Sequence, residues 1–166
     1  MMKIKLLLLL FFVAPTFLLA QDKREFFMVK TNTTEVKIPG KWEQLNKMDD
    51  SGQTYLKNEE GVIIAVAQNP KKAYSFFKSN KSDFDNVKAF YKWDSDFRKE
   101  NRFPVEKLKE NAKQKYIIWK FNEDNMDNVF LFGSSKANFL NLLVYSNLWQ
   151  ESEKIQFLES LYELNK

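Results

Sequence analysis

The sequence predicts an α+β protein in which helices cover both faces of an antiparallel β-sheet. Three observations support this prediction. Strand and helix patterns follow one another in blocks, as strands, helix, strands and helix, and the strands are joined by short hairpin connections. Several strands are apolar at nearly every position, as in 62–67, 116–119 and 140–144, so both of their faces need a cover. The two helices are the natural candidates for those covers.

Five short strands are expected in the first half of the chain, at 26–29, 36–38, 42–45, 55–56 and 62–67. Turn residues separate them. The stretches 49–52 and 58–61 each end in a glycine that can adopt a positive φ, which is typical of a hairpin turn. Pro39-Gly40 favours a type II turn after the second strand.

The first helix is expected to begin at Ser82, because Ser82 and Asp85 have the spacing of a capping box. It should end before Pro104. Its apolar residues recur at intervals of three, four and seven: Phe84, Val87, Phe90, Tyr91 and Phe97.

Four more strands are expected after this helix, at 105–109, 116–121, 129–132 and 139–145. A second helix, capped by Ser152 or a neighbouring residue, should close the chain. Its apolar stripe consists of Ile155, Leu158, Leu161 and Tyr162.

Residues 1–20 have the pattern of a secretory signal peptide. Lys3 and Lys5 precede an unbroken apolar run at 6–13, and the segment ends in a small residue, which predicts cleavage between Ala20 and Gln21. The alternative is an uncleaved membrane anchor, but the run is shorter than the roughly 20 apolar residues that span a bilayer. A lipid anchor is excluded because the chain has no cysteine. We therefore expect a single domain at 21–166, located in the periplasm or secreted, with no transmembrane segment after signal cleavage.

The composition of residues 21–166 excludes several classes of function. Without Lys3 and Lys5, 24 basic residues face 22 acidic ones, a net charge of +2, so we expect no nucleic-acid partner. The chain has neither histidine nor cysteine, which excludes Ser-His-Asp and Cys-His triads and zinc sites built on these residues. We predict no cofactor, no metal and no catalytic residue. Stability must come from packing of the many aromatic side chains rather than from disulfides.

The remaining candidates for chemistry are carboxylates and polar loops. Asp94 and Asp96 would point about 200° apart on a helix, which favours a solvated surface over an acid/base pair. The stretch 123–128 could be a calcium loop, but it lacks the glycine and glutamate of an EF-hand, so a polar hairpin is favoured. The stretch 133–136 is similarly expected to be a turn rather than a phosphate loop or a Ser-Lys site.

The segment 69–81 is long and polar, yet it contains three aromatic residues among lysines. One interpretation, which we favour, is that the aromatic residues cap the core. The other is an apolar, lysine-rimmed lip for a hydrophobic, anionic or peptide ligand. The predicted binding residues are Tyr74, Phe76, Phe77, Lys78 and Trp93.

The Ile38-Pro39-Gly40-Lys41-Trp42 stretch is followed by a meander, a helix after a long loop, a three-strand return and a closing Glu153-Lys154-Ile155-Gln156-Phe157-Leu158 helix. This arrangement resembles the PsbP/Mog1-like α/β/α sandwich superfamily over residues 25–164. The resemblance implies the sandwich architecture and a place among small binding or assembly factors, many of them exported. It implies no functional residue.

Three functions follow as expectations. The first is an exported, non-enzymatic binding or assembly factor whose partner is a protein, a peptide or a hydrophobic or anionic ligand in the envelope. The second is an envelope hydrolase that uses only Asp and Glu, acting on cell-wall glycan or another carbohydrate. The third is an exported inhibitor or immunity protein.

Overall fold

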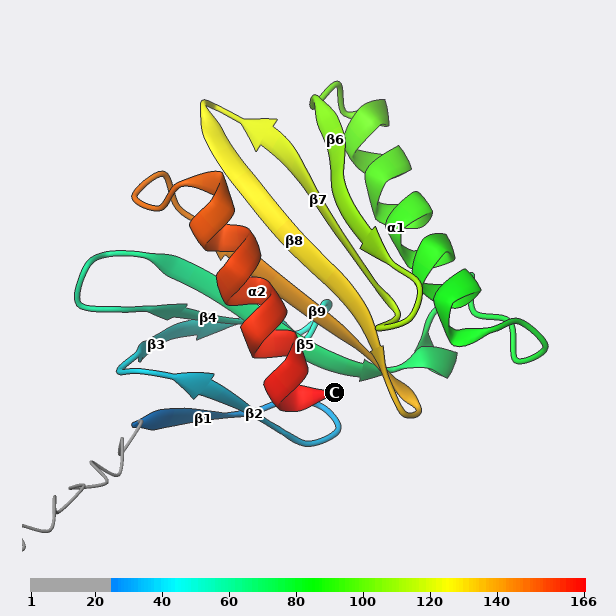
Figure 1. The fold of residues 1–166 in the computed structure, drawn as a ribbon, viewed down its shortest axis with the longest axis horizontal. Helices are drawn as coiled ribbons and strands as arrows, with labels where there is room; N and C mark the ends of the chain where they lie inside the picture. Colours follow the sequence, from blue (N-terminus) through cyan, green and yellow to red (C-terminus); the bar gives the residue numbers. More distant parts are fainter. Residues whose placement is uncertain (1–24) are drawn as a thin grey trace, which may run out of the picture.

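Nine strands and two α-helices make up residues 25–166, the part of the chain that the computed structural model describes (Figure 1). The predicted signal peptide lies outside these residues. The helices are α1 (Asp83–Glu100) and α2 (Glu151–Asn165), with a short 3₁₀ helix η1 (Lys71–Ala73). The strands are β1 (Phe26–Lys30), β2 (Glu35–Pro39), β3 (Glu43–Lys47), β4 (Thr54–Lys57), β5 (Ile63–Pro70), β6 (Val105–Asn111), β7 (Tyr116–Glu123), β8 (Met126–Ser135) and β9 (Asn138–Tyr145). The predicted α+β class and the predicted order of helices and strands along the chain are confirmed.

Seven strands form one antiparallel sheet in the order β3-β4-β5-β9-β8-β7-β6. Strands β5 and β9 pair at its centre, from Ile63 opposite Tyr145 to Pro70 opposite Asn138, and so join the two halves of the chain. Strands β1 and β2 do not join this sheet but form a hairpin of their own. Both bury only alternate residues, among them Val36 and Ile38 of β2, so one face of the hairpin packs on the core.

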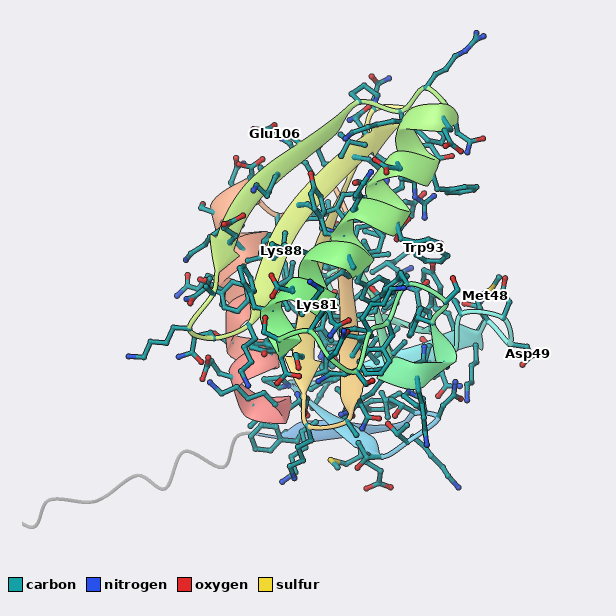
Figure 2. All side chains as sticks on the ribbon, turned by 90° about the vertical axis from the view of Figure 1, so that its right-hand side faces the viewer. Met48, Asp49, Lys81, Lys88, Trp93 and Glu106 are labelled. Carbon is teal, nitrogen blue, oxygen red and sulfur yellow. The ribbon has the colours of Figure 1, made fainter. Side chains whose placement is uncertain are left out.

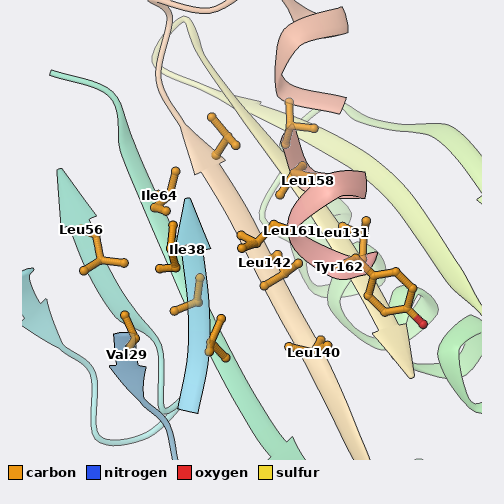
Figure 3. Packing of buried hydrophobic residues seen from close by; sticks show 14 of the residues in the cluster. Val29, Ile38, Leu56, Ile64, Leu131, Leu140, Leu142, Leu158, Leu161 and Tyr162 are labelled. Atoms are coloured by element: carbon orange, nitrogen blue, oxygen red, sulfur yellow. The ribbon is translucent and has the colours of Figure 1, made fainter. Parts of the chain in front are cut away.

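Two hydrophobic clusters fill the core, and successive residues of the central strands belong to different clusters. The first, around α2, contains Leu131 and Leu142 together with Leu158 and Tyr162 (Figure 3). The second, around α1, is mostly aromatic, and in it Phe90 stacks on Phe132 with ring centroids 3.9 Å apart. Because neighbouring residues of a strand point to opposite faces, the central strands are buried on both faces, as their apolar runs predicted.

Each of the two α-helices begins directly after a capping residue. The Ser82 hydroxyl accepts a hydrogen bond from the Asp85 amide at 3.0 Å and donates one to the Asp85 carboxylate, which confirms the predicted start of α1. Helix α2 is capped by Gln150 rather than Ser152, because the Glu153 carboxylate accepts the Gln150 amide hydrogen at 2.7 Å. No helix among the described residues is long and apolar enough to span a membrane.

The turns are confirmed with one exception. Gly52 and Gly61 have φ values of +67° and +90°, and the stretch 123–128 forms the predicted hairpin between β7 and β8. The predicted turn at 133–136 was wrong for its first three residues, which continue β8; only Lys136, with φ of +51°, turns the chain. The reason is strand pairing, because Gly133 lies opposite Tyr116 of β7 and Leu140 of β9, and the absence of a Cβ leaves room for the Tyr162 ring of α2.

Candidate functional site

A cavity of about 580 Å³ lies between α1, the β3–β4 turn and the end of β5. We call it the α1 pocket. Figure 2 shows Trp93 projecting from α1 on the side of the molecule where the β3–β4 turn, with Met48 and Asp49, lies. The apolar wall is mainly aromatic and consists of Tyr74, Phe90, Trp93, Phe97 and Phe130. Ligand sites commonly have this size and an apolar wall.

The segment 69–81 caps the core and also contributes to the pocket. Phe76 stacks on Phe90 with ring centroids 5.4 Å apart, and Phe77 packs against the same α1 cluster. Tyr74 lies between these rings and the pocket, with its centroid 6.3 Å from that of Trp93. Of the five predicted binding residues, Tyr74 and Trp93 therefore line the pocket, whereas Phe76, Phe77 and Lys78 do not.

The lysines of this segment face other groups. The buried Lys71 ammonium donates to the Asp83 carboxylate at 2.5 Å and to the Lys136 carbonyl at 2.6 Å, so it ties η1 to the start of α1. Burial raises the pKa of Asp83, but hydrogen bonds and charges from Lys115 and Lys71 outweigh it and hold the pKa below its ordinary value. The Lys78 backbone is bonded to the Asn86 amide. No lysine lines the α1 pocket.

The Asn69 side chain joins three segments at the pocket. Its amide nitrogen donates to the Ser51 carbonyl at 2.9 Å and to the Tyr74 hydroxyl at 3.0 Å, and its oxygen accepts from the Asn32 amide at 2.8 Å. Gly52 lies against this group, where a Cβ atom would overlap the Asn32 and Asn69 amides. These hydrogen bonds join the β1–β2 loop, the β3–β4 turn and Tyr74, the residue that follows η1.

Asp94 and Arg98 form an ion pair in the pocket wall, with Arg98 Nε 3.1 Å from Asp94 Oδ1. The prediction that Asp94 is a solvated surface residue was wrong: 12% of its side chain is exposed, whereas Asp96 is exposed and pairs with Lys92. Burial raises the pKa of Asp94 above its ordinary value, although Arg98 lowers it in part. The Arg98 guanidinium also stacks over the Phe121 ring at 4.3 Å.

Two polar atoms of pocket residues have no hydrogen-bond partner among residues 25–166. They are the donor Gln53 Nε2 and the acceptor Asn141 Oδ1, both buried. Asn141 interrupts an apolar strand in which Leu140 and Leu142 face the α2 cluster, so its side chain lies on the α1 side. Both atoms are closed off from solvent, so the polar groups that the pocket presents come from other atoms of its wall, among them the Asp94 and Arg98 pair.

Sequence reasoning missed most of the polar residues of the site. Asp94 and Arg98 follow Phe90 at intervals of four, so their positions on the apolar stripe of α1 were a usable indication. The single polar residue Asn141 within an apolar strand was another usable indication. Gln53, Asn69 and Asp50 had no such indication, because they meet only through the pairing of distant strands.

The pocket is suited to holding a small molecule through stacking and hydrogen bonds. One arginine faces two aspartates, Asp50 and Asp94, so the wall does not favour an anion. Within residues 25–166, no group of three or more acidic, histidine or cysteine side chains is placed to hold a metal ion.

No protein-family model matches the sequence, and no curated protein matches it. Among solved structures, the chain is similar to cyanobacterial PsbP (CyanoP) from Synechocystis sp. PCC 6803. The match has 10% sequence identity and a TM-score of 0.38, and it covers 78% of this chain and 81% of that chain. The match says nothing of ligand, partner or site residues.

Proposed function

We propose that the protein is an exported, non-enzymatic binding protein that holds a small ligand in the α1 pocket. In this proposal the fold is an α/β/α sandwich, with α1 over one face of the seven-stranded sheet and α2 and the β1–β2 hairpin over the other. The division of the core into two clusters, one around each helix, supports the sandwich.

The observation that carries the proposal is one cavity in which an aromatic wall lies beside the ion pair of Asp94 and Arg98. Ligand sites commonly combine an apolar wall with a few polar groups that fix the orientation of the bound molecule. Such a site is selective for molecules with polar groups at defined places.

The charged residues of the wall favour a different class of ligand from the anionic one that a lysine-rimmed lip would bind. Neither Lys71 nor Lys78 lines the pocket, and its aspartates, Asp50 and Asp94, outnumber its single arginine, Arg98. We infer that the ligand is uncharged or cationic rather than anionic.

A fragment titration followed by NMR tests the proposal. Fragments that enter the pocket should shift the indole resonance of Trp93 and the side-chain amides of Gln53 and Asn141 together. The Trp149 indole, which donates to Glu60 far along the chain and does not line the pocket, is the internal control. A broad set of fragments that moves none of these three resonances would refute the proposal.

Export is part of the same proposal and is tested separately. The full chain, expressed in a Gram-negative host, should be recovered from the periplasm or medium with Gln21 as its first residue. Replacing Leu8 and Leu9 with Arg should leave the uncleaved chain in the cytoplasm, because a charged h-region is not recognised as a signal. Recovery of uncleaved wild-type chain in the membrane fraction would contradict cleavage.

A second candidate, an Asp-dependent glycan hydrolase, is favoured by one observation. Asp50 and Asp94 line the same cavity, and burial raises the pKa of Asp94, as a general acid requires. Release of reducing sugar from cell-wall glycan would be measured with the wild type and with Asp94→Asn. Activity lost in Asp94→Asn but kept in Asp96→Asn would favour the hydrolase; no release by the wild type would exclude it.

A further inference from the structure

We propose that the α1 pocket binds an ammonium group carried on a small apolar body. The inference rests on the proposed function, and it selects the cationic class from the uncharged and cationic ligands that the wall allows.

The first argument is a carboxylate oxygen of Asp94 that has no partner. Arg98 Nε donates to Asp94 Oδ1 at 3.1 Å, and no other group among residues 25–166 donates to this carboxylate. The second oxygen, Oδ2, is not closed off from solvent, in contrast to Gln53 Nε2 and Asn141 Oδ1. Burial raises the pKa of Asp94 in spite of the bond from Arg98, so that bond does not offset the cost of burying the carboxylate. An ammonium group in the pocket can donate to Asp94 Oδ2.

The second argument is the charge of the pocket wall. Asp50 and Asp94 are its acidic residues and Arg98 is its one basic residue, so one negative charge is left over. The exposed Asp50 carboxylate is bonded only to a backbone amide within the described part of the chain, at 2.7 Å. Lys47 donates to the Asn32 side chain at 3.3 Å and does not line the pocket. A neutral ligand would leave the surplus charge in place and an anion would add to it, whereas a cation balances it.

The third argument is the aromatic surface beside these charges. Trp93 and Phe97 line the pocket and are 53% and 55% exposed. The Trp93 ring packs against Phe76 and Phe90, with centroids at 5.6 and 6.3 Å, so neighbouring side chains hold it in place. The face of an indole attracts a cation and also buries apolar groups. The apolar body of the ligand would cover this surface while its ammonium group faces the carboxylates.

The pocket wall already holds one cation by the same chemistry. The Arg98 guanidinium bonds to Asp94 and lies over the rings of Phe97 and Phe121, at 5.5 and 4.3 Å from their centroids. A ligand ammonium would repeat this arrangement at the other oxygen of Asp94, against the face of Trp93.

The test compares three molecules of similar size that differ in charge. They are 2-phenylethylamine, 2-phenylethanol and 3-phenylpropionate, which carry an ammonium, a hydroxyl and a carboxylate on the same phenyl body. Each is titrated at neutral pH into the ¹⁵N-labelled chain, and the Trp93 indole resonance is followed by NMR, with the Trp149 indole as the internal control. The amine should bind about tenfold or more tightly than the alcohol, because it adds a charge interaction to the same ring contact. The carboxylate should give no saturable shift.

Phenylalanine distinguishes two sources of the ammonium group, because it carries the same ring with the ammonium beside a carboxylate. Tighter binding of phenylalanine than of 2-phenylethylamine would identify an amino acid as the source, and weaker binding would identify a free amine. Both results support the inference. Binding of phenylalanine without any binding of 2-phenylethylamine would overturn it, because the ammonium group would then not be sufficient.

Variants then assign the contacts. Asp94→Asn should weaken binding of the amine by about tenfold and Asp50→Asn by about threefold, since each removes one negative charge from the wall. Because Asp50 is exposed, Asp50→Asn tests the charge even if Asp94→Asn does not fold. Asp96→Asn and Asp49→Asn are matched controls at acids that do not line the pocket, and they should leave the affinity unchanged. With both wall aspartates replaced only Arg98 stays charged, so 3-phenylpropionate should then bind more tightly than the amine.

The inference and the proposed function fail in different ways. If 2-phenylethanol or 3-phenylpropionate binds as tightly as the amine at the Trp93 indole, the inference is overturned and the binding function stands. Equal affinity of the wild type, Asp50→Asn and Asp94→Asn for the amine would overturn the inference as well. If neither these compounds nor a broad set of fragments moves the pocket resonances, both proposals are overturned.

Discussion

At the scale of single residues, the missing side chain of Gly133 leaves room for the Tyr162 ring. The Tyr162 ring lies where a Cβ on Gly133 would be, and its hydroxyl donates to the Gln114 and Ser134 carbonyls, each at 2.7 Å. Burial raises the pKa of Tyr162 to about 12, so the hydroxyl stays protonated over the working pH range. A small residue in the strand thus decides where α2 rests.

We predict that Gly133→Ala destabilises the protein by about 1–3 kcal/mol, because an added methyl group overpacks the core against Tyr162. Urea unfolding measures the change. The control is the same substitution in a Tyr162→Leu background, where the loss should be smaller because the ring is gone. Equal losses in both backgrounds would show that the ring is not the obstacle.

Asp94 and Asp96, two residues apart on α1, should affect the pH dependence of stability with opposite signs. Burial raises the folded-state pKa of Asp94, so the folded state binds that proton more tightly than the unfolded state. The stability of the wild type relative to Asp94→Asn should therefore fall as the pH rises. The fall should begin near the unfolded-state pKa of about 3.9 and continue through the raised folded-state pKa of Asp94.

For Asp96 the Lys92 hydrogen bond lowers the folded-state pKa. The wild type should be more stable than Asp96→Asn above about pH 3.9. This advantage should be lost as the pH falls through the lowered folded-state pKa of Asp96. Urea unfolding of the three proteins at closely spaced pH values distinguishes the two slopes. Slopes of the same sign would mean that Asp94 is not buried as described.

At the scale of elements, the pocket depends on three loops that Asn69 holds together. Asn69 is the last residue but one of β5 and lies opposite Phe139 of β9, so the central strand pair places its amide between the β1–β2 loop, the β3–β4 turn and Tyr74. These loops therefore form one side of the pocket, and α1 forms the other.

We predict that Asn69→Leu lowers stability by about 1–3 kcal/mol, since the partners at Ser51 and Asn32 lose their bonds. It should also broaden the Trp93 indole resonance, because the Tyr74 loop loses its anchor. Asn69→Asp keeps the acceptor for Asn32 but not the donors, and it should give an intermediate loss. Asn80→Leu, in the exposed part of the same loop, is the control and should change neither quantity.

At the scale of the whole molecule, the two clusters meet across one sheet, and we expect residues 21–166 to unfold as a single unit. Trp119 lies in the α1 cluster, whereas Trp42 and Trp149 pack against the α2 cluster. Variants that keep only Trp119 or only Trp42 should give the same urea midpoint by fluorescence as by far-UV circular dichroism. Two distinct midpoints would indicate that the clusters are separate domains.

The elements of this fold were predictable because each has a local cause. These causes are the Ser82 cap, the apolar spacing of α1 and the turn glycines. Each involves residues close together in the chain, so a single sequence reveals it. The separate β1–β2 hairpin and the extension of β8 through Gly133 were not predictable in this way, because they depend on how strands pair across the sheet.

The sequence by itself determined the class of the fold, the order of its elements and the chemistries that the chain lacks, since these depend on residue type and periodicity. Only the tertiary structure decided the site. Strand pairing brings Gln53, Asn69 and Asn141 to one wall, and the packing of α1 turns Asp94 inward while Asp96 faces solvent. Contacts between residues so far apart depend on the register of the whole sheet, which no local pattern encodes.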